Sequence, residues 1–125
     1  MDVAPEDLVK AAEDAYNALD VDRVLRLFTP DAVFVMNGKL KSKGADELRR
    51  FHERFFGAVE DYRLRKTLRA AAGEVVAVEF EETWVSTSDG TPMEAFGGEF
   101  WTVDGDRLAE WRLYWRSYAR TDGAG

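Results

Sequence analysis

The chain has 125 residues, with 24 acidic and 17 basic side chains and a net charge of −7. It contains no cysteine and one histidine, His52, which excludes disulfides, thiol nucleophiles, iron–sulfur clusters and metal sites built from cysteines or several histidines. The acidic balance argues against a nucleic acid or an anionic membrane as a partner, because phosphate binding depends on clustered Lys and Arg.

The first half of the chain has mainly helical periodicity. Proline and acidic residues open a helix over about 5–19, where apolar residues recur on one face. Asp22 is expected to cap a short second helix that runs through Phe28. A strand over 32–36 is followed by a tight Asn-Gly turn, and a third helix is expected over about 45–59.

The second half alternates apolar and polar residues, which is typical of strands. We expect strands near 62–71, 74–86, 92–103 and 107–118, joined by turns rich in Gly and Asp. Helices followed by an antiparallel meander predict an α+β fold, with the helices on one face of a curved sheet.

The register of these strands decides which side chains face inward. Pairing Ala70 with Glu74 places Arg65 opposite Glu79 on the outer face. A type I turn with Gly90 at the bulge position then places Trp84 opposite Glu94.

In that register Phe80 lies opposite Gly98, and the inner face becomes apolar except at Glu82 and Glu94. The last strand presents Trp111, Leu113 and Trp115 inward.

Two segments carry a family resemblance: "LFTPDAVFVMNG" at 27–38 and "GEFWTVDGDRLAEWRLYW" at 98–115. With the helices around them they resemble the nuclear transport factor 2-like superfamily, above all its SnoaL-like polyketide cyclases, limonene-epoxide hydrolase and ketosteroid isomerase. The resemblance implies one domain over 1–125, with a core at about 6–118 and a tail at 119–125. It also implies a cone-shaped, cystatin-like α+β barrel with a deep pocket, often dimeric through the outer face of the sheet.

The catalytic patterns of these relatives transfer only in part. The base of ketosteroid isomerase falls at Met36. The arginine of the epoxide hydrolase pattern falls at Phe80, and its last-strand aspartate falls at Leu113. Its other carboxylate is matched by Glu82, and its tryptophan by Trp111.

Three residues are candidates for catalysis. A carboxylate among aromatic rings loses hydration, which raises its pKa, so Glu82 is the candidate general base; the alternatives are that a register slip exposes it or that it is only ion-paired. His52 is the candidate acid partner of Glu82, or else a packed residue beside Phe51. Tyr16 either donates a hydrogen bond to a ligand oxygen or belongs to the core.

A further set of mostly apolar residues is expected to bind the substrate, unless these side chains simply fill the core. The set is Phe34, Met36, Phe55, Phe80, Trp84, Glu94, Phe96, Phe100, Trp111 and Leu113. On the outer face Trp101, Tyr114 and Met93 are expected to form a homodimer interface.

These observations predict a cofactor-free, metal-free enzyme of the SnoaL-like type. It would do proton-transfer chemistry, such as cyclisation, dehydration, isomerisation or epoxide opening, on a small apolar ligand that carries oxygen. The alternatives are a ligand-binding domain without catalysis and an interaction module that uses the outer sheet face. An acidic N-terminus and the lack of a long apolar run suggest a cytoplasmic protein that does not contact membranes.

Overall fold

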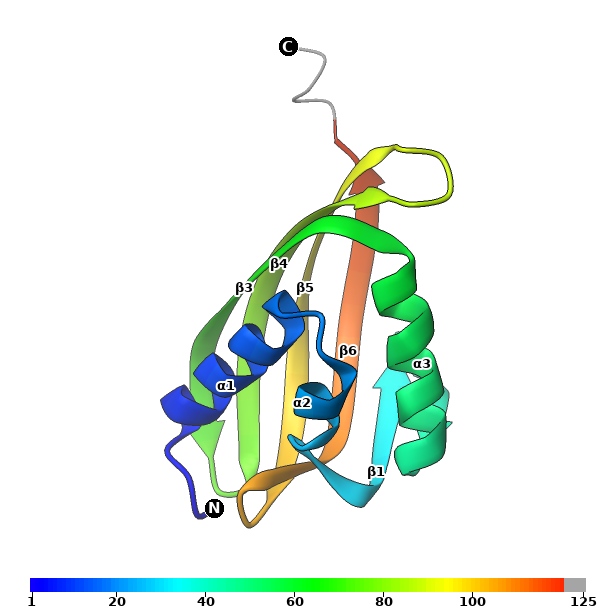
Figure 1. Cartoon of the computed structure of the whole chain (residues 1–125). Helices are drawn as coiled ribbons and strands as arrows, with labels where there is room; N and C mark the ends of the chain where they lie inside the picture. The colour runs from blue at the N-terminus through cyan, green and yellow to red at the C-terminus, as the bar shows by residue number, and fades with distance from the viewer. Residues whose placement is uncertain (121–125) are drawn as a thin grey trace.

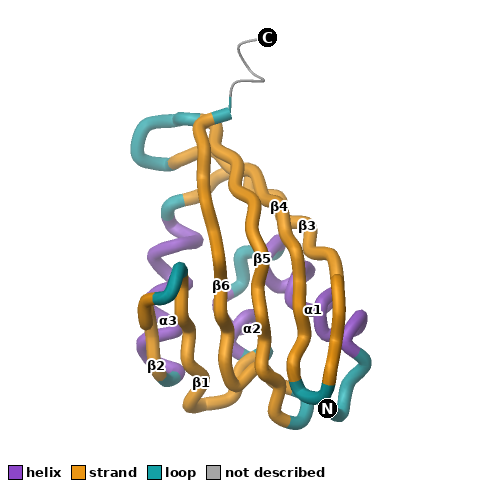
Figure 2. The backbone as a smooth tube through the Cα atoms, turned by 180° about the vertical axis from the view of Figure 1, so that it is seen from behind, coloured by secondary structure: helices purple, strands orange, loops and turns teal. Residues whose placement is uncertain are grey.

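Three helices lie over one face of a six-stranded sheet in the computed structural model, which describes residues 1–120 (Figure 1). Seen from behind, the sheet stands in front of all three helices (Figure 2). The helices are α1 (Pro5–Asn17), α2 (Val21–Leu25) and α3 (Ala45–Gly57). The strands are β1 (Phe28–Met36), β2 (Lys39–Lys43), β3 (Val59–Ala72), β4 (Val75–Ser86), β5 (Pro92–Asp104) and β6 (Arg107–Ala119).

The sheet has the order β2-β1-β6-β5-β4-β3, and every neighbouring pair is antiparallel except β1 and β6. This arrangement confirms the α+β prediction. The sheet is curved but open, since β2 and β3 remain as edges, so the expected barrel does not close. Ala119 belongs to β6, and residues 121–125 of the expected tail lie outside the described residues.

The helix boundaries differ from the prediction at two places. The cap of α2 is Asp20, whose carboxylate accepts from the Arg23 amide at 3.1 Å, whereas Asp22 forms an ion pair with Arg49 of α3 at 2.8 Å. The helix ends early because Phe28 already pairs with β6. Likewise α3 ends at Gly57, because Val59 begins β3.

Between Arg63 and Leu68, the pairing of β3 with β4 is shifted by two residues from the predicted register. Arg65 lies opposite Glu81 and forms an ion pair with it. A two-residue shift leaves the side chains of this stretch on their predicted faces, because strand side chains alternate with a period of two. Beyond the irregularity between Leu68 and Ala70 the shift is three residues, since Ala70 lies opposite Ala77 and not opposite Glu74. Leu64, Val78 and Phe80 accordingly face the helices and are buried.

The pairing of β4 with β5 is shifted by one residue, and this reverses the faces of β5. Ser86 pairs with Thr91 across a loop of four residues, 87–90, so Trp84 lies opposite Met93 and Glu82 opposite Ala95. The type I turn with a Gly90 bulge is one residue shorter. An odd shift exchanges inner and outer side chains.

Three residues that were expected to line the pocket therefore lie on the outer face of the sheet, so the prediction for them is wrong. Phe96 and Phe100 are 49% and 48% exposed, and Glu94 lies opposite Thr83 on the outer face. Conversely, Trp101 is 1% exposed and Met93 packs against the core. The prediction that these two residues lie on the outer face is therefore wrong. Within residues 1–120, no helix is both long and apolar enough to cross a membrane.

Candidate functional site

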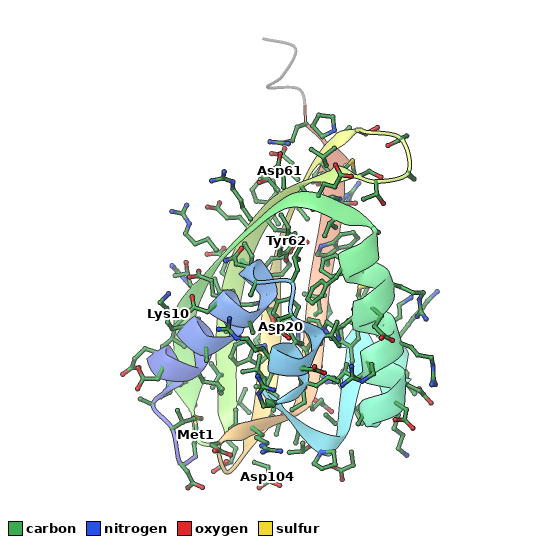
Figure 3. The ribbon with its side chains drawn as sticks, viewed as in Figure 1. Met1, Lys10, Asp20, Asp61, Tyr62 and Asp104 are labelled. Atoms are coloured by element: carbon green, nitrogen blue, oxygen red, sulfur yellow. The ribbon has the colours of Figure 1, made fainter. Side chains whose placement is uncertain are left out.

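A cavity of about 310 Å³ lies between the helices and the inner face of the sheet. The side chains that line it come from α1, α3 and every strand except β2. They are Tyr16, Met36, Phe51, Phe55, Ala58, Val59, Tyr62, Leu64, Lys66, Phe80, Glu82, Trp84, Ser86, Glu99, Trp111, Leu113 and Trp115. Tyr62, on β3, lies between α1 and α3 in the view of Figure 3. The volume and the apolar wall suit a small ligand.

Glu82 faces this cavity from β4 and is 7% exposed. Its two oxygens are held separately, because the Tyr62 hydroxyl donates to Oε2 at 2.7 Å and the Trp115 indole N–H donates to Oε1 at 3.1 Å. Burial raises the pKa of Glu82 above its usual value, and the two donors offset part of that rise. The prediction that Glu82 points inward is confirmed.

A second carboxylate, Glu99, reaches the same cavity from β5 and is 2% exposed. Its Oε1 accepts from the indole N–H groups of Trp101 and Trp111, both at 2.8 Å, and its Oε2 accepts from the Lys66 ammonium. The ion pair is almost completely buried, with 5% of the Lys66 side chain exposed.

The sequence reasoning missed Lys66, Glu99 and Tyr62. For Lys66 the signal was present, since it stands between Leu64 and Leu68 in the inward phase of β3. For Glu99 the expected register gives the opposite face, because Glu99 lies two residues from Trp101 on the same side of β5 and the whole strand is expected one residue out of register.

His52 and Tyr16 form a separate buried pair beside the cavity. The His52 Nδ1 lies 2.9 Å from the Leu48 carbonyl oxygen, which only accepts, so Nδ1 carries the proton. The Nε2 atom of neutral His52 is then an acceptor, and the Tyr16 hydroxyl donates to it at 2.7 Å. Burial lowers the pKa of His52 to about 4, which keeps the ring neutral near pH 7.

This pair changes the roles expected for both residues. The partners of Glu82 are Tyr62 and Trp115, and His52 is not part of the cavity wall, so the expected contact between His52 and Glu82 is not made. Tyr16 does reach the cavity, but its proton is already donated to His52. On the side of the cavity its oxygen can therefore only accept a hydrogen bond, and of the two expected roles the burial of Tyr16 fits that of a core residue.

Six of the predicted substrate-binding residues line the cavity: Met36, Phe55, Phe80, Trp84, Trp111 and Leu113. Phe34 lies one layer deeper, stacked on Trp111 with 3.9 Å between ring centroids. Glu94 and Phe96 instead line a hollow of the outer face beside Arg65 and Glu81. In residues 1–120, no cluster of three or more His, Asp or Glu side chains is arranged to hold a metal ion.

Residues 9–111 match the family model of the SnoaL-like domain. The chain belongs to this family. Among curated proteins, none matches the chain.

Several solved structures share the fold of this SnoaL-like domain. The epoxide hydrolase/cyclase-like enzyme SalBIII, described in pyran ring formation in the polyether salinomycin, is 19% identical with a TM-score of 0.82, over 93% of this chain and 95% of that one. A putative polyketide cyclase from a Silicibacter species is 17% identical with a TM-score of 0.79, covering 90% and 88%. An epoxide hydrolase of M. tuberculosis resembling limonene-epoxide hydrolase is 19% identical with a TM-score of 0.70, covering 90% and 82%.

Proposed function

We propose that this SnoaL-like domain binds a small apolar ligand that carries oxygen, and that Glu82 acts on it as a general base. The observation that carries the proposal is the Glu82 carboxylate, buried in the wall of an apolar cavity and held by Tyr62 and Trp115. Two donors fix its orientation and leave each oxygen with a free lone pair.

The environment of Glu82 favours proton abstraction. A carboxylate whose pKa is raised by burial is a stronger base than one in water. Proton transfer from a ligand carbon or a bound water would start a cyclisation, dehydration, isomerisation or epoxide opening. Such chemistry needs a positioned base and a shielded cavity, and the aromatic rings around Glu82 supply the shielding.

A binding protein without catalysis is the second candidate. Met36 and Leu113 support it, because both line the cavity as apolar side chains at positions where related enzymes are expected to place polar catalytic groups. In this case the protein would bind the ligand in the same cavity without catalysing a reaction.

The test compares wild type with Glu82→Gln on a panel of apolar ketones and cyclic epoxides. Ligand affinity is measured by calorimetry, and chemistry by deuterium uptake of ketones and by epoxide opening, both followed by NMR. Glu82→Gln keeps the side-chain volume, so we expect retained affinity and a loss of rate of roughly 10²- to 10⁴-fold. Glu81→Gln, on the adjacent outer position, is the matched control.

Two results would count against catalysis by Glu82. A Glu82→Gln variant as fast as wild type removes its role as base. A wild-type protein that binds ligands tightly but turns over none of the panel supports the binding protein instead.

A further inference from the structure

Lys66 is a buried cation that the proposed base chemistry does not use. Its ammonium lies 5.4 Å from the centroid of the Tyr16 ring, 5.3 Å from that of Phe80 and 5.8 Å from that of Trp101. Aromatic faces attract a desolvated cation, and together with Glu99 they hold the ammonium in one place.

The hydrogen bonds of the ion pair are unequally satisfied. Glu99 accepts from three donors, namely Trp101, Trp111 and Lys66. An ammonium has three N–H groups, and within residues 1–120 the ammonium of Lys66 donates only to Glu99. Two N–H groups of a buried cation are therefore left without a protein acceptor at the wall of the cavity.

Lys66 and Glu82 are placed to act on one ligand. Glu82 pairs with Leu64, so Lys66, two residues further along β3, is its diagonal neighbour on the same face. Diagonal neighbours in antiparallel strands have Cα atoms about 7–8 Å apart. A small ligand that contacts the ammonium with one atom thus places an adjacent carbon near the carboxylate.

We propose that Lys66 binds the carbonyl oxygen of a neutral ketone in this cavity and receives the negative charge when Glu82 removes the adjacent proton. The inference rests on the proposed function and names its substrate class. In this step the C–H bond adjacent to the carbonyl breaks, and the proton goes to a Glu82 oxygen. The C–H electron pair forms the C=C bond of an enolate, and the carbonyl π pair moves to the oxygen held by Lys66.

Charge balance favours a neutral ligand over a carboxylate. With Glu82 ionised, as the proposed step requires, Glu82 and the Glu99–Lys66 ion pair together carry one net negative charge. Tyr16 and Tyr62 are neutral, because burial raises the pKa of each hydroxyl well above its usual value. A ligand carboxylate would add a second uncompensated charge in a desolvated site. Enolate formation only moves the existing charge from Glu82 to the oxygen beside Lys66, where an oriented cation stabilises it.

The test uses a double variant, Lys66→Met with Glu99→Gln. Lys66→Met alone leaves a buried, unpaired carboxylate, which is strongly destabilising. The double variant removes both charges at nearly constant volume and keeps an acceptor for Trp101 and Trp111. Its thermal unfolding is measured first, and the single variant Lys66→Arg, which keeps a cation paired with Glu99, is the matched control.

Calorimetry then measures the binding of three probes: β-tetralone, tetralin without the carbonyl, and naphthoate. We expect the double variant to bind tetralin as wild type does and to lose about 10-fold or more in affinity for β-tetralone, as expected for a lost hydrogen bond to a charged group. Lys66→Arg, which still donates from a cation, is expected to keep the preference for β-tetralone over tetralin. Wild type is expected to bind β-tetralone more tightly than naphthoate.

Each other outcome overturns the proposal for Lys66. An equal loss of affinity for β-tetralone and tetralin would make Lys66 a packing residue. Misfolding of the double variant would have the same meaning if Lys66→Arg folds and shows no preference for the ketone. Tighter binding of naphthoate than of β-tetralone reverses the ligand class. If deuterium uptake depends on Glu82 but β-tetralone binds the double variant as tightly as wild type, only the proposed role of Lys66 is overturned and the role of Glu82 as base stands. If wild type binds none of the probes, the proposals for Lys66 and for Glu82 are both overturned.

Discussion

The two carboxylates of the cavity are stabilised in different ways. Glu99 is held by a cation and two indole N–H groups, whereas Glu82 is held by two neutral donors. A cation stabilises a carboxylate charge more than a neutral donor does. For this reason we propose Glu82, and not Glu99, as the carboxylate that transfers the proton, with Glu99 holding the Lys66 ammonium.

Tyr62→Phe tests this assignment at Glu82. The Tyr62 hydroxyl lowers the pKa of Glu82, so its removal should raise that pKa further and move the rising, acidic limb of any pH–rate profile to higher pH. Carbon-detected NMR of the labelled Glu82 carboxyl measures the change. Tyr114→Phe, at an exposed position of β6, should leave the titration unchanged. An unshifted or lowered pKa in Tyr62→Phe would contradict the assignment.

His52 makes stability depend on pH. Its pKa is about 4 in the folded protein against 6.5 as the ordinary value, so the unfolded chain binds a proton that the folded chain rejects. The contribution of neutral His52 to the free energy of unfolding is therefore fully present above pH 6.5 and is lost as the pH falls toward 4. At about 1.4 kcal/mol per pKa unit, the loss is about 3 kcal/mol.

His52→Gln removes this titration. Urea unfolding of both proteins between pH 4 and 7.5 should show the free energy of wild type converging on that of the variant as the pH falls. The raised pKa of Glu82 has the opposite effect on stability but is common to both proteins, so it cancels in the difference. Parallel curves over the whole range would show that His52 titrates normally.

At the scale of elements, β5 depends on a close approach at Gly97. A Cβ there would lie 2.0 Å from the Tyr114 carbonyl oxygen of β6 and 2.7 Å from the Phe80 ring of β4. Neither distance is compatible with a side chain, and one of the two atoms is backbone. The missing side chain lets Phe80 lie across β5 and form part of the cavity wall.

Gly97→Ala is therefore expected to destabilise the protein by about 3 kcal/mol, the upper range for overpacking. The neighbouring Gly98→Ala is a matched control, because its nearest contact would be an ordinary 3.8 Å, and we expect it to change the stability by less than about 1 kcal/mol. Chemical unfolding of both variants measures the difference. Equal stability of the two would mean that the β5–β6 pairing relaxes without cost.

For the molecule as a whole, the outer face of the sheet predicts self-association. Phe96, Phe100, Tyr114 and Tyr118 are each 46–49% exposed, and the Phe100 and Tyr114 rings are 6.2 Å apart. The Arg65–Glu81 pair on the same face supplies both signs of charge, which a two-fold interface between identical chains can match. We predict a homodimer through this face.

Sedimentation at micromolar concentration measures this association. Wild type should have the mass of a dimer, and Phe100→Glu should shift it to the mass of a monomer. Leu40→Glu, which changes an exposed apolar residue on the edge strand β2, should leave the dimer intact. A monomeric wild type would remove the interface.

The α+β fold and the inward direction of Glu82 and Trp111 followed from the sequence alone. Periodicity is a local property, so apolar spacing in α1 and alternation in β4 and β6 determine which face of each element is buried. The register between one strand and the next depends in addition on the length of the loop that joins them. A single residue in the 87–90 loop exchanged the faces of β5 and with them Phe96, Phe100 and Glu99.

The polar contacts of the site were decided only by the tertiary structure. The Glu99 cluster joins β3, β5 and β6, and the hydrogen bond between Tyr16 and His52 joins two helices 36 positions apart. Such contacts depend on how far each strand slides and how strongly the sheet curves, which no local pattern encodes. The sequence thus determined the buried face of α1, β4 and β6, while the register of β5 and the packing of the helices on the sheet decided which buried side chains meet.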